Sequence, residues 1–148
     1  PEFEEIAEMF DVMSLLEGFC AHRACEKMTS RKFAHLEKLH AKLEENFERH
    51  DQEEYIRVNH QYHSLVQEIA GNRTLNQIVD VLRKKILLYR FQSLNLPDRF
   101  ASSIREHRDL LEAFRQRDDS RAEALMRQHL QNQTQALKNL VEQSQAAT

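Results

Sequence analysis

The segment FEEIAEMFDVMSLLEGFCAHRACEKM, residues 3–28, decides the fold class. Its apolar residues recur every three or four positions, which is the spacing of one face of an amphipathic helix. A half-buried strand would instead alternate apolar and polar residues. The segment therefore predicts one long helix whose apolar stripe faces a core. That stripe contains Ile6, Met9, Phe10, Met13, Leu16, Cys20 and Ala24.

The rest of the chain continues the same pattern. The 148 residues include only two glycines and two prolines, too few for the many turns of a sandwich, a barrel or a Rossmann-type fold. Helical stripes recur in five further segments: residues 33–47, 55–70, 75–89, 100–114 and 122–141. Because the connections are short, we expect one all-α domain over residues 1–148, an antiparallel bundle of six to seven helices.

Capping residues mark where these helices begin and end. The expected signals are Thr29–Ser30, Asp51 with Glu54, Gly71–Asn72, Thr74, and Ser120 with Glu123. The apolar density of residues 75–89 predicts a central, largely buried fourth helix. Residues 93–98 are expected to form the longest loop, and residues 143–148 a frayed tail.

Composition excludes several classes of protein. No apolar run is long enough to span a membrane, and no secretory signal opens the chain. With 21 basic and 24 acidic residues, the net charge of −3 gives no basic field for nucleic acid. Cys20 and Cys25 fall on different sides of one helix, so we expect free thiols and a cytoplasmic protein. Because the chain starts at Pro1 rather than Met, we expect it to be a fragment or a processed form.

Three histidines occupy positions where a core apolar residue is expected. His63, His107 and His129 lie on the inner stripes of three different helices, and Asn59 precedes His63 by one turn. Either each is a core histidine with its own hydrogen-bond partner, or the imidazoles converge on a divalent cation with the Asn59 carbonyl oxygen as fourth ligand. Periodicity leaves both interpretations open. The remaining histidines are expected on polar faces, at helix ends or in ordinary packing: His22, His35, His40, His50 and His60.

A series of short motifs runs along nearly the whole chain. LE at residues 16–17 is followed by NHQYH at 59–63 and GN at 71–72. SIREH at 103–107 and AEALMRQH at 122–129 complete the series. In this order the motifs resemble the FCD domain, the C-terminal effector-binding domain of FadR-like GntR transcription regulators.

The resemblance implies a helical bundle that binds a metal ion and a small organic acid. The metal ligands it implies are Asn59, His63, His107 and His129. It also implies a homodimer that reaches operator DNA only through an N-terminal winged helix-turn-helix domain, which we expect to lie outside this chain, and it implies no membrane partner. The net negative charge of this chain agrees with a separate DNA-binding domain, because the basic DNA-binding surface would belong to the winged helix-turn-helix domain.

The ligand set favours particular metals and effectors. Imidazole-rich ligation suits zinc, with nickel as the alternative, better than calcium or magnesium. Asn59 is neutral where the family also uses Asp, so the charge of the cation is uncompensated. We therefore expect an anion, such as the carboxylate of a small effector, at the open positions.

The wall of the expected effector site departs from the family pattern. Many members place Arg four residues before the Glu of the first helix, and this chain has Met13 there. Arg90 is then the best candidate to grip an acid, although a surface position is equally compatible with the sequence. Glu17 could orient a ligating histidine or pair with a buried cation. Glu106 points about 100° away from His107 and is expected in a local ion pair or a cap contact rather than as a metal ligand.

The leading hypothesis is a ligand sensor in which metal and effector shift the helices and so change how a dimer presents its DNA-binding domains. Two alternatives stay open. A structural dimerisation module would bind no metal, and its histidines would only pack. A metal-dependent hydrolase would activate water at the site. No separate general base or nucleophile is visible in the sequence, so we do not expect an enzyme.

Overall fold

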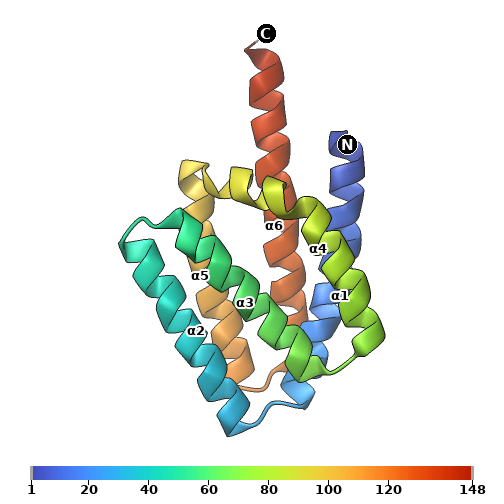
Figure 1. The fold of residues 1–148 in the computed structure, drawn as a ribbon, viewed down its shortest axis with the longest axis vertical. Helices are drawn as coiled ribbons and strands as arrows, with labels where there is room; N and C mark the ends of the chain where they lie inside the picture. Colours follow the sequence, from blue (N-terminus) through green and yellow to red (C-terminus); the bar gives the residue numbers. More distant parts are fainter. Residues whose placement is uncertain (1, 148) are drawn as a thin grey trace.

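The computed structural model describes residues 2–147, which form six helices and no strand. Successive helices reverse direction, as expected for an antiparallel bundle (Figure 1). Pro1 and Thr148 lie outside the described residues. The helices are α1 (Phe3–Glu26), α2 (Ser30–Glu48), α3 (Gln52–Ala70), α4 (Arg73–Leu94), α5 (Pro97–Arg115) and α6 (Asp119–Ala146).

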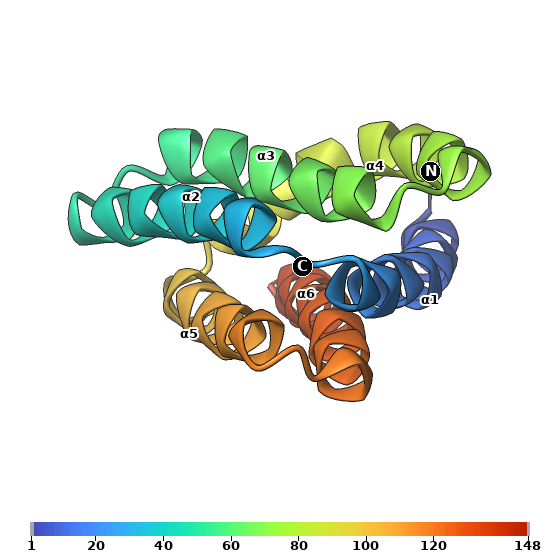
Figure 2. The ribbon, with the colours of Figure 1, turned by 90° about the horizontal axis from the view of Figure 1, so that it is seen from below.

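The helices are arranged in two layers, with α2, α3 and α4 in one and α5, α6 and α1 in the other (Figure 2). Within the second layer α1 packs along α6, where a Cβ added at Gly18 would lie 2.4 Å from Cγ of Arg127. Contacts of α1 with α3 and of α2 with α5 join the layers. The apolar stripes therefore meet between the layers, and the helices that carry the predicted metal ligands face one another there.

Several helix ends follow the predicted capping chemistry. The side chains of Thr29 and Asp51 accept hydrogen bonds from the backbone N–H groups of Lys32 and Glu54, at the starts of α2 and α3. Gly71 ends α3 with a φ of 71°, the left-handed conformation that glycine adopts without strain. These helix ends could be predicted because each capping signal involves only residues next to the helix end.

Other predicted ends are wrong by a few residues. Asn72, not Thr74, caps α4, and Asp118, not Ser120, caps α6. In both cases an earlier side-chain oxygen accepts the free N–H, so the helix starts sooner. The expected loop at residues 93–98 shortens to the two residues between α4 and α5, and α6 continues to Ala146 where a frayed tail was expected.

The prediction of a largely buried fourth helix is wrong. α4 turns Arg83 and Arg90 inward, at 2% and 4% exposure, because both pair with the buried carboxylate of Glu17. With its arginines inside, α4 leaves five large apolar side chains at the surface. These are Ile78, Val81, Leu87, Leu88 and Phe91.

Cys20 and Cys25 are both buried free thiols, as their spacing predicts. Among residues 2–147, no helix combines the length and the apolar character needed to cross a bilayer.

Candidate metal centre

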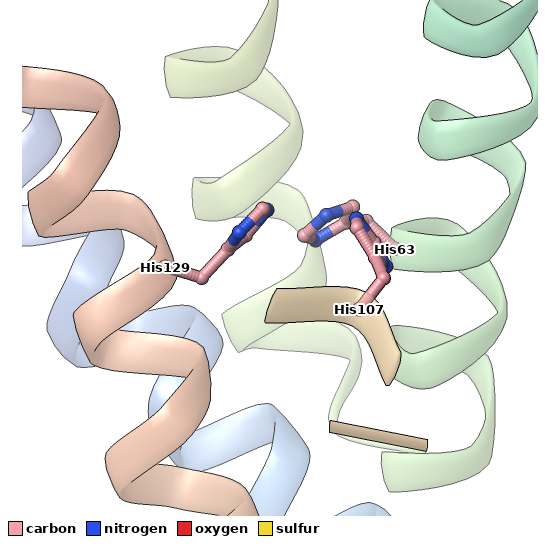
Figure 3. A group of neighbouring side chains, drawn as sticks. All are labelled: His63, His107 and His129. Atoms are coloured by element: carbon pink, nitrogen blue, oxygen red, sulfur yellow. The ribbon is translucent and has the colours of Figure 1, made fainter. Parts of the chain in front are cut away.

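Helices α3, α5 and α6 each direct one histidine to a common point inside the bundle (Figure 3). His63, His107 and His129 are 1%, 0% and 2% exposed, and one ligand nitrogen from each lies within 4.8 Å of the other two. The rings of His63 and His129 stack with centroids 5.6 Å apart, while the His107 ring stands edge-on to both. The structure thus brings together the three histidines that the sequence singled out.

These imidazoles carry ring nitrogens that have no hydrogen-bond partner in the described part of the chain. His63 and His129 each leave Nε2 unpaired, and His107 leaves both ring nitrogens unpaired. Oδ1 of Asn59, one turn before His63, is also buried and unpaired. Each such atom costs about 1–3 kcal/mol when no partner is supplied. Three imidazoles and one carboxamide oxygen in this state fit a late divalent transition metal.

The rings need only a small adjustment to hold one ion. Ligand nitrogens in a tetrahedral zinc site lie about 3.4 Å apart, given Zn–N distances of roughly 2.0–2.1 Å. The corresponding atoms here are separated by up to 4.8 Å. Modest side-chain rotations would close this difference.

A buried carboxylate orients His63. Glu17 of α1, 1% exposed, accepts a 2.9 Å hydrogen bond from Nδ1 of His63, which leaves the Nε2 lone pair for a metal. Nη2 of Arg83 lies 2.5 Å from Oε1 of Glu17, and Nη2 of Arg90 lies 3.5 Å from Oε2. Burial would raise the pKa of Glu17, but the charge of Arg83 and the contacts with His63 and Arg90 hold it well below its ordinary value. Glu17 is therefore an anion.

His129 has a matching arrangement. Its Nδ1 lies 2.6 Å from Oε1 of Glu106, whose two oxygens accept hydrogen bonds of 2.7 and 2.8 Å from Arg99. Asn132 donates a further bond of 2.9 Å to Oε2. Burial opposes ionisation of Glu106, yet the hydrogen bonds from His129 and Arg99 lower its pKa to about 2. The ion pair expected for Glu106 is confirmed, and the same carboxylate also orients a predicted ligand.

The three imidazoles are neutral at neutral pH. Burial lowers the pKa of His63 to about 3 even though Glu17 acts in the opposite direction. Burial likewise lowers the pKa of His129, and it holds the pKa of His107 well below its ordinary value. Since a metal binds only the neutral imidazole, the ligands are in their binding form.

The residues expected to line an effector site lie on the inner faces of α1 and α4. Met13 is fully buried one turn before Glu17. A surface position for Arg90 is wrong, because its side chain is buried and its Nε donates a 3.2 Å hydrogen bond to Oε1 of Gln133. Nη2 of Arg90 has no hydrogen-bond partner within residues 2–147. Arg90 therefore keeps a donor for a further acceptor.

Two arginines that hold the orienting carboxylates were missed from the sequence. Arg83 lies four residues after Val79 and seven before Arg90, so all three share one face of α4. Arg99 lies seven residues before Glu106 and is likewise on its face of α5. These spacings were the sequence signal from which the positions of Arg83 and Arg99 on these helix faces could have been predicted.

A second group of metal-ligating side chains lies at the surface, where α1 ends and α6 begins. Nε2 of His22 is 2.9 Å from Glu26 and 3.6 Å from Asp119, and all three side chains are partly exposed. Polar contacts of this kind are typical of solvated helix ends. The exposed group at His22 therefore serves as a control for zinc binding by the three buried histidines.

Comparison with known families identifies the domain. The family model described as the FCD domain matches residues 8–132. The chain belongs to the FCD domain family. The matched region includes Asn59, His63, His107 and His129, and FCD domains are effector-binding regulatory domains of GntR-family regulators.

Solved structures of two regulators share this fold. E. coli McbR/YncC superposes with a TM-score of 0.85 at 20% identity, over 95% of this chain and 68% of that one. Streptococcus agalactiae GntR gives 0.76 at 20% identity, over 91% of this chain and 60% of that one. The FCD domain described here therefore spans less than two thirds of the streptococcal regulator. No curated protein matches the sequence.

Proposed function

We propose that this FCD domain senses a small carboxylate through a bound divalent metal. Asn59, His63, His107 and His129 would hold the ion, which is zinc or, as the alternative, nickel. The observation that carries this proposal is the set of buried ring nitrogens with no partner among the described residues. The metal would supply a Lewis-acidic centre at which an anionic ligand can bind.

The charges around the site favour an anionic effector. Arg83, Arg90 and Arg99 are buried, and among residues 2–147 only Glu17 and Glu106 lie in ion pairs with them. Three cations against two anions leave one positive charge, and a divalent ion bound by neutral ligands raises the excess to three. A carboxylate near the metal would reduce this excess, and Nη2 of Arg90, which is 3.5 Å from Glu17 but makes no hydrogen bond among the described residues, can donate to it.

The same geometry does not favour the enzyme alternative. A metal-activated water needs a base to accept its proton. Glu17 and Glu106, the carboxylates next to the ligating histidines, already accept hydrogen bonds from those histidines and from arginines. We therefore propose a regulatory domain that acts in the cytoplasm as a homodimer and reaches DNA only through a separate winged helix-turn-helix domain.

Removing the metal should destabilise the domain. Zinc at 100 times its dissociation constant would stabilise the folded chain by about 2.7 kcal/mol. For a chain of this length we expect a melting temperature about 5–10 °C higher with zinc than in excess chelator, measured by differential scanning calorimetry. Unchanged melting together with substoichiometric metal in the purified protein would favour the structural-module alternative.

Carboxylate binding should depend on the metal and on Arg90. We expect calorimetric titration with acetate, lactate, malate and citrate to detect at least one ligand of the zinc-loaded chain, and at least tenfold weaker binding in chelator. Arg90→Gln should weaken that binding about 10- to 100-fold, because a charge-assisted hydrogen bond contributes roughly 1.5–3 kcal/mol. Lys84→Gln, exposed on the same helix, is the matched control. If Arg90→Gln and Lys84→Gln bound the carboxylate equally well, Arg90 would not be part of the effector site.

A further inference from the structure

Two of the three converging histidines are each held by a carboxylate, and the third is not. Nδ1 of His63 lies 2.9 Å from Glu17, and Nδ1 of His129 lies 2.6 Å from Glu106. Both ring nitrogens of His107, in contrast, have no hydrogen-bond partner among residues 2–147. A histidine that gives one nitrogen to a metal almost always donates the N–H of the other to an acceptor. The metal centre is therefore complete only if an acceptor for His107 lies nearby.

His40 of α2 carries a buried ring nitrogen of the complementary kind. Its side chain is 8% exposed, and its Nε2 lies 3.0 Å from Oε1 of Glu44. The hydrogen bond from Arg108 lowers the pKa of Glu44, so this carboxylate is an anion and can only accept. Nε2 of His40 therefore carries the proton and Nδ1 the lone pair. Nδ1 is buried and has no hydrogen-bond partner in the described part of the chain.

Glu44 also fixes His40 on the side of α2 that faces His107. Nε and Nη2 of Arg108 lie 2.6 and 2.7 Å from the two oxygens of Glu44, and Arg108 directly follows His107 in α5. One carboxylate thus joins α2 to α5 at the level of the metal centre. Burial, followed by the charges of other histidines including His40, holds the pKa of His107 well below its ordinary value, as expected for close neighbours.

We propose that His40 is a positioning residue of the metal centre, whose Nδ1 accepts a hydrogen bond from the non-ligating ring N–H of His107. This inference rests on the metal of the proposed function. The series His107–His40–Glu44 would match the two carboxylate–histidine pairs that hold the other ligands. Each histidine of the site would then be oriented by a carboxylate, in this case through a second imidazole.

Two tyrosines next to His107 are less suited to this role. The rings of Tyr62 and Tyr55 stand edge-on to the His107 ring, with centroids 5.1 and 6.4 Å away. The Tyr55 hydroxyl is already paired with Ser103 at 2.9 Å. The Tyr62 hydroxyl is buried and unpaired within residues 2–147, so it is the alternative acceptor that an experiment must separate from His40.

Replacing His40 with leucine tests the inference. Zinc affinity, measured by competition with a chromophoric indicator, should fall about 10–100-fold, the usual cost of losing an outer partner of a ligand. Melting in excess chelator should stay close to that of the parent, because the change removes an unpaired buried nitrogen. His40→Asn keeps an acceptor oxygen near the position of Nδ1 and should lose less than about tenfold. His35→Leu, at an exposed histidine of the same helix, and Tyr62→Phe should bind zinc like the parent.

Nuclear magnetic resonance observes the bond directly. The zinc-loaded chain should show a scalar coupling between Nδ1 of His40 and the protonated nitrogen of His107, and this coupling should vanish in chelator. Its absence from a chain that binds zinc would overturn the inference.

The other outcomes are equally distinct. A parent chain that binds no zinc would overturn the proposed metal site as well. If the parent binds zinc and His40→Leu binds it equally well, the positioning role alone is wrong. A fall of about 1,000-fold would make His40 a ligand instead. Weaker zinc binding by Tyr62→Phe but not by His40→Leu would assign the acceptor to Tyr62.

Discussion

Replacing His107 with alanine should abolish stoichiometric zinc binding while the fold is retained. His107 would provide the one ligand from α5, and both of its ring nitrogens lack partners in the described chain. Loss of an outer partner of a ligand typically costs 10–100-fold in metal affinity, so loss of a ligand itself should cost about 1,000-fold. Competition with a chromophoric zinc indicator measures this change, and metal analysis after dialysis should find less than one tenth of an equivalent.

The surface group at His22 supplies the control for this experiment. His22→Ala removes an imidazole of comparable ligand chemistry and should leave one tightly bound zinc per chain. In excess chelator, His107→Ala should melt close to the parent, because removing two unpaired buried nitrogens offsets part of the cost of the cavity. If His22→Ala loses the zinc and His107→Ala keeps it, the metal belongs to the surface group.

The three converging histidines could be predicted as inward residues because each breaks a strong local pattern. A polar residue in an apolar stripe of period 3.6 must point inward, whatever the helix packs against. Asn59 and His63, one turn apart, share a face for the same reason. Convergence of the three histidines is a property of the tertiary fold, so periodicity alone could not establish it. The order of the family motifs along the chain provided that information.

The orientation of α4 could not be predicted in the same way. This helix carries apolar residues on several faces, so two orientations about its axis bury similar apolar area. The apolar density of residues 75–89 therefore predicted burial without showing which side faces the core. The inward side carries Arg83 because Glu17, which lies more than 60 positions earlier, pairs with it inside the bundle. A long-range ion pair decides which face of α4 turns inward, whereas the spacing of Arg83 and Arg90 shows only that the two share a face.

Glu17 therefore has two proposed roles that a pair of substitutions can separate. It would orient His63 for a metal, and it compensates the charges of Arg83 and Arg90 inside the bundle. The first role acts only on the metal-loaded protein. The second acts on the fold with or without metal, because α4 keeps its arginines inside only while an anion faces them.

Glu17→Gln should consequently destabilise the metal-free chain by about 3–5 kcal/mol, the cost of leaving a buried charge without its partner. Urea unfolding in excess chelator measures this effect, with Glu8→Gln, an exposed neighbour on α1, as control. Adding Arg83→Met should recover much of the loss, since the unpaired charge is then gone. Zinc affinity should stay 10–100-fold reduced in the double variant, because His63 still lacks its carboxylate. Full recovery of zinc affinity would limit Glu17 to the charge-compensating role.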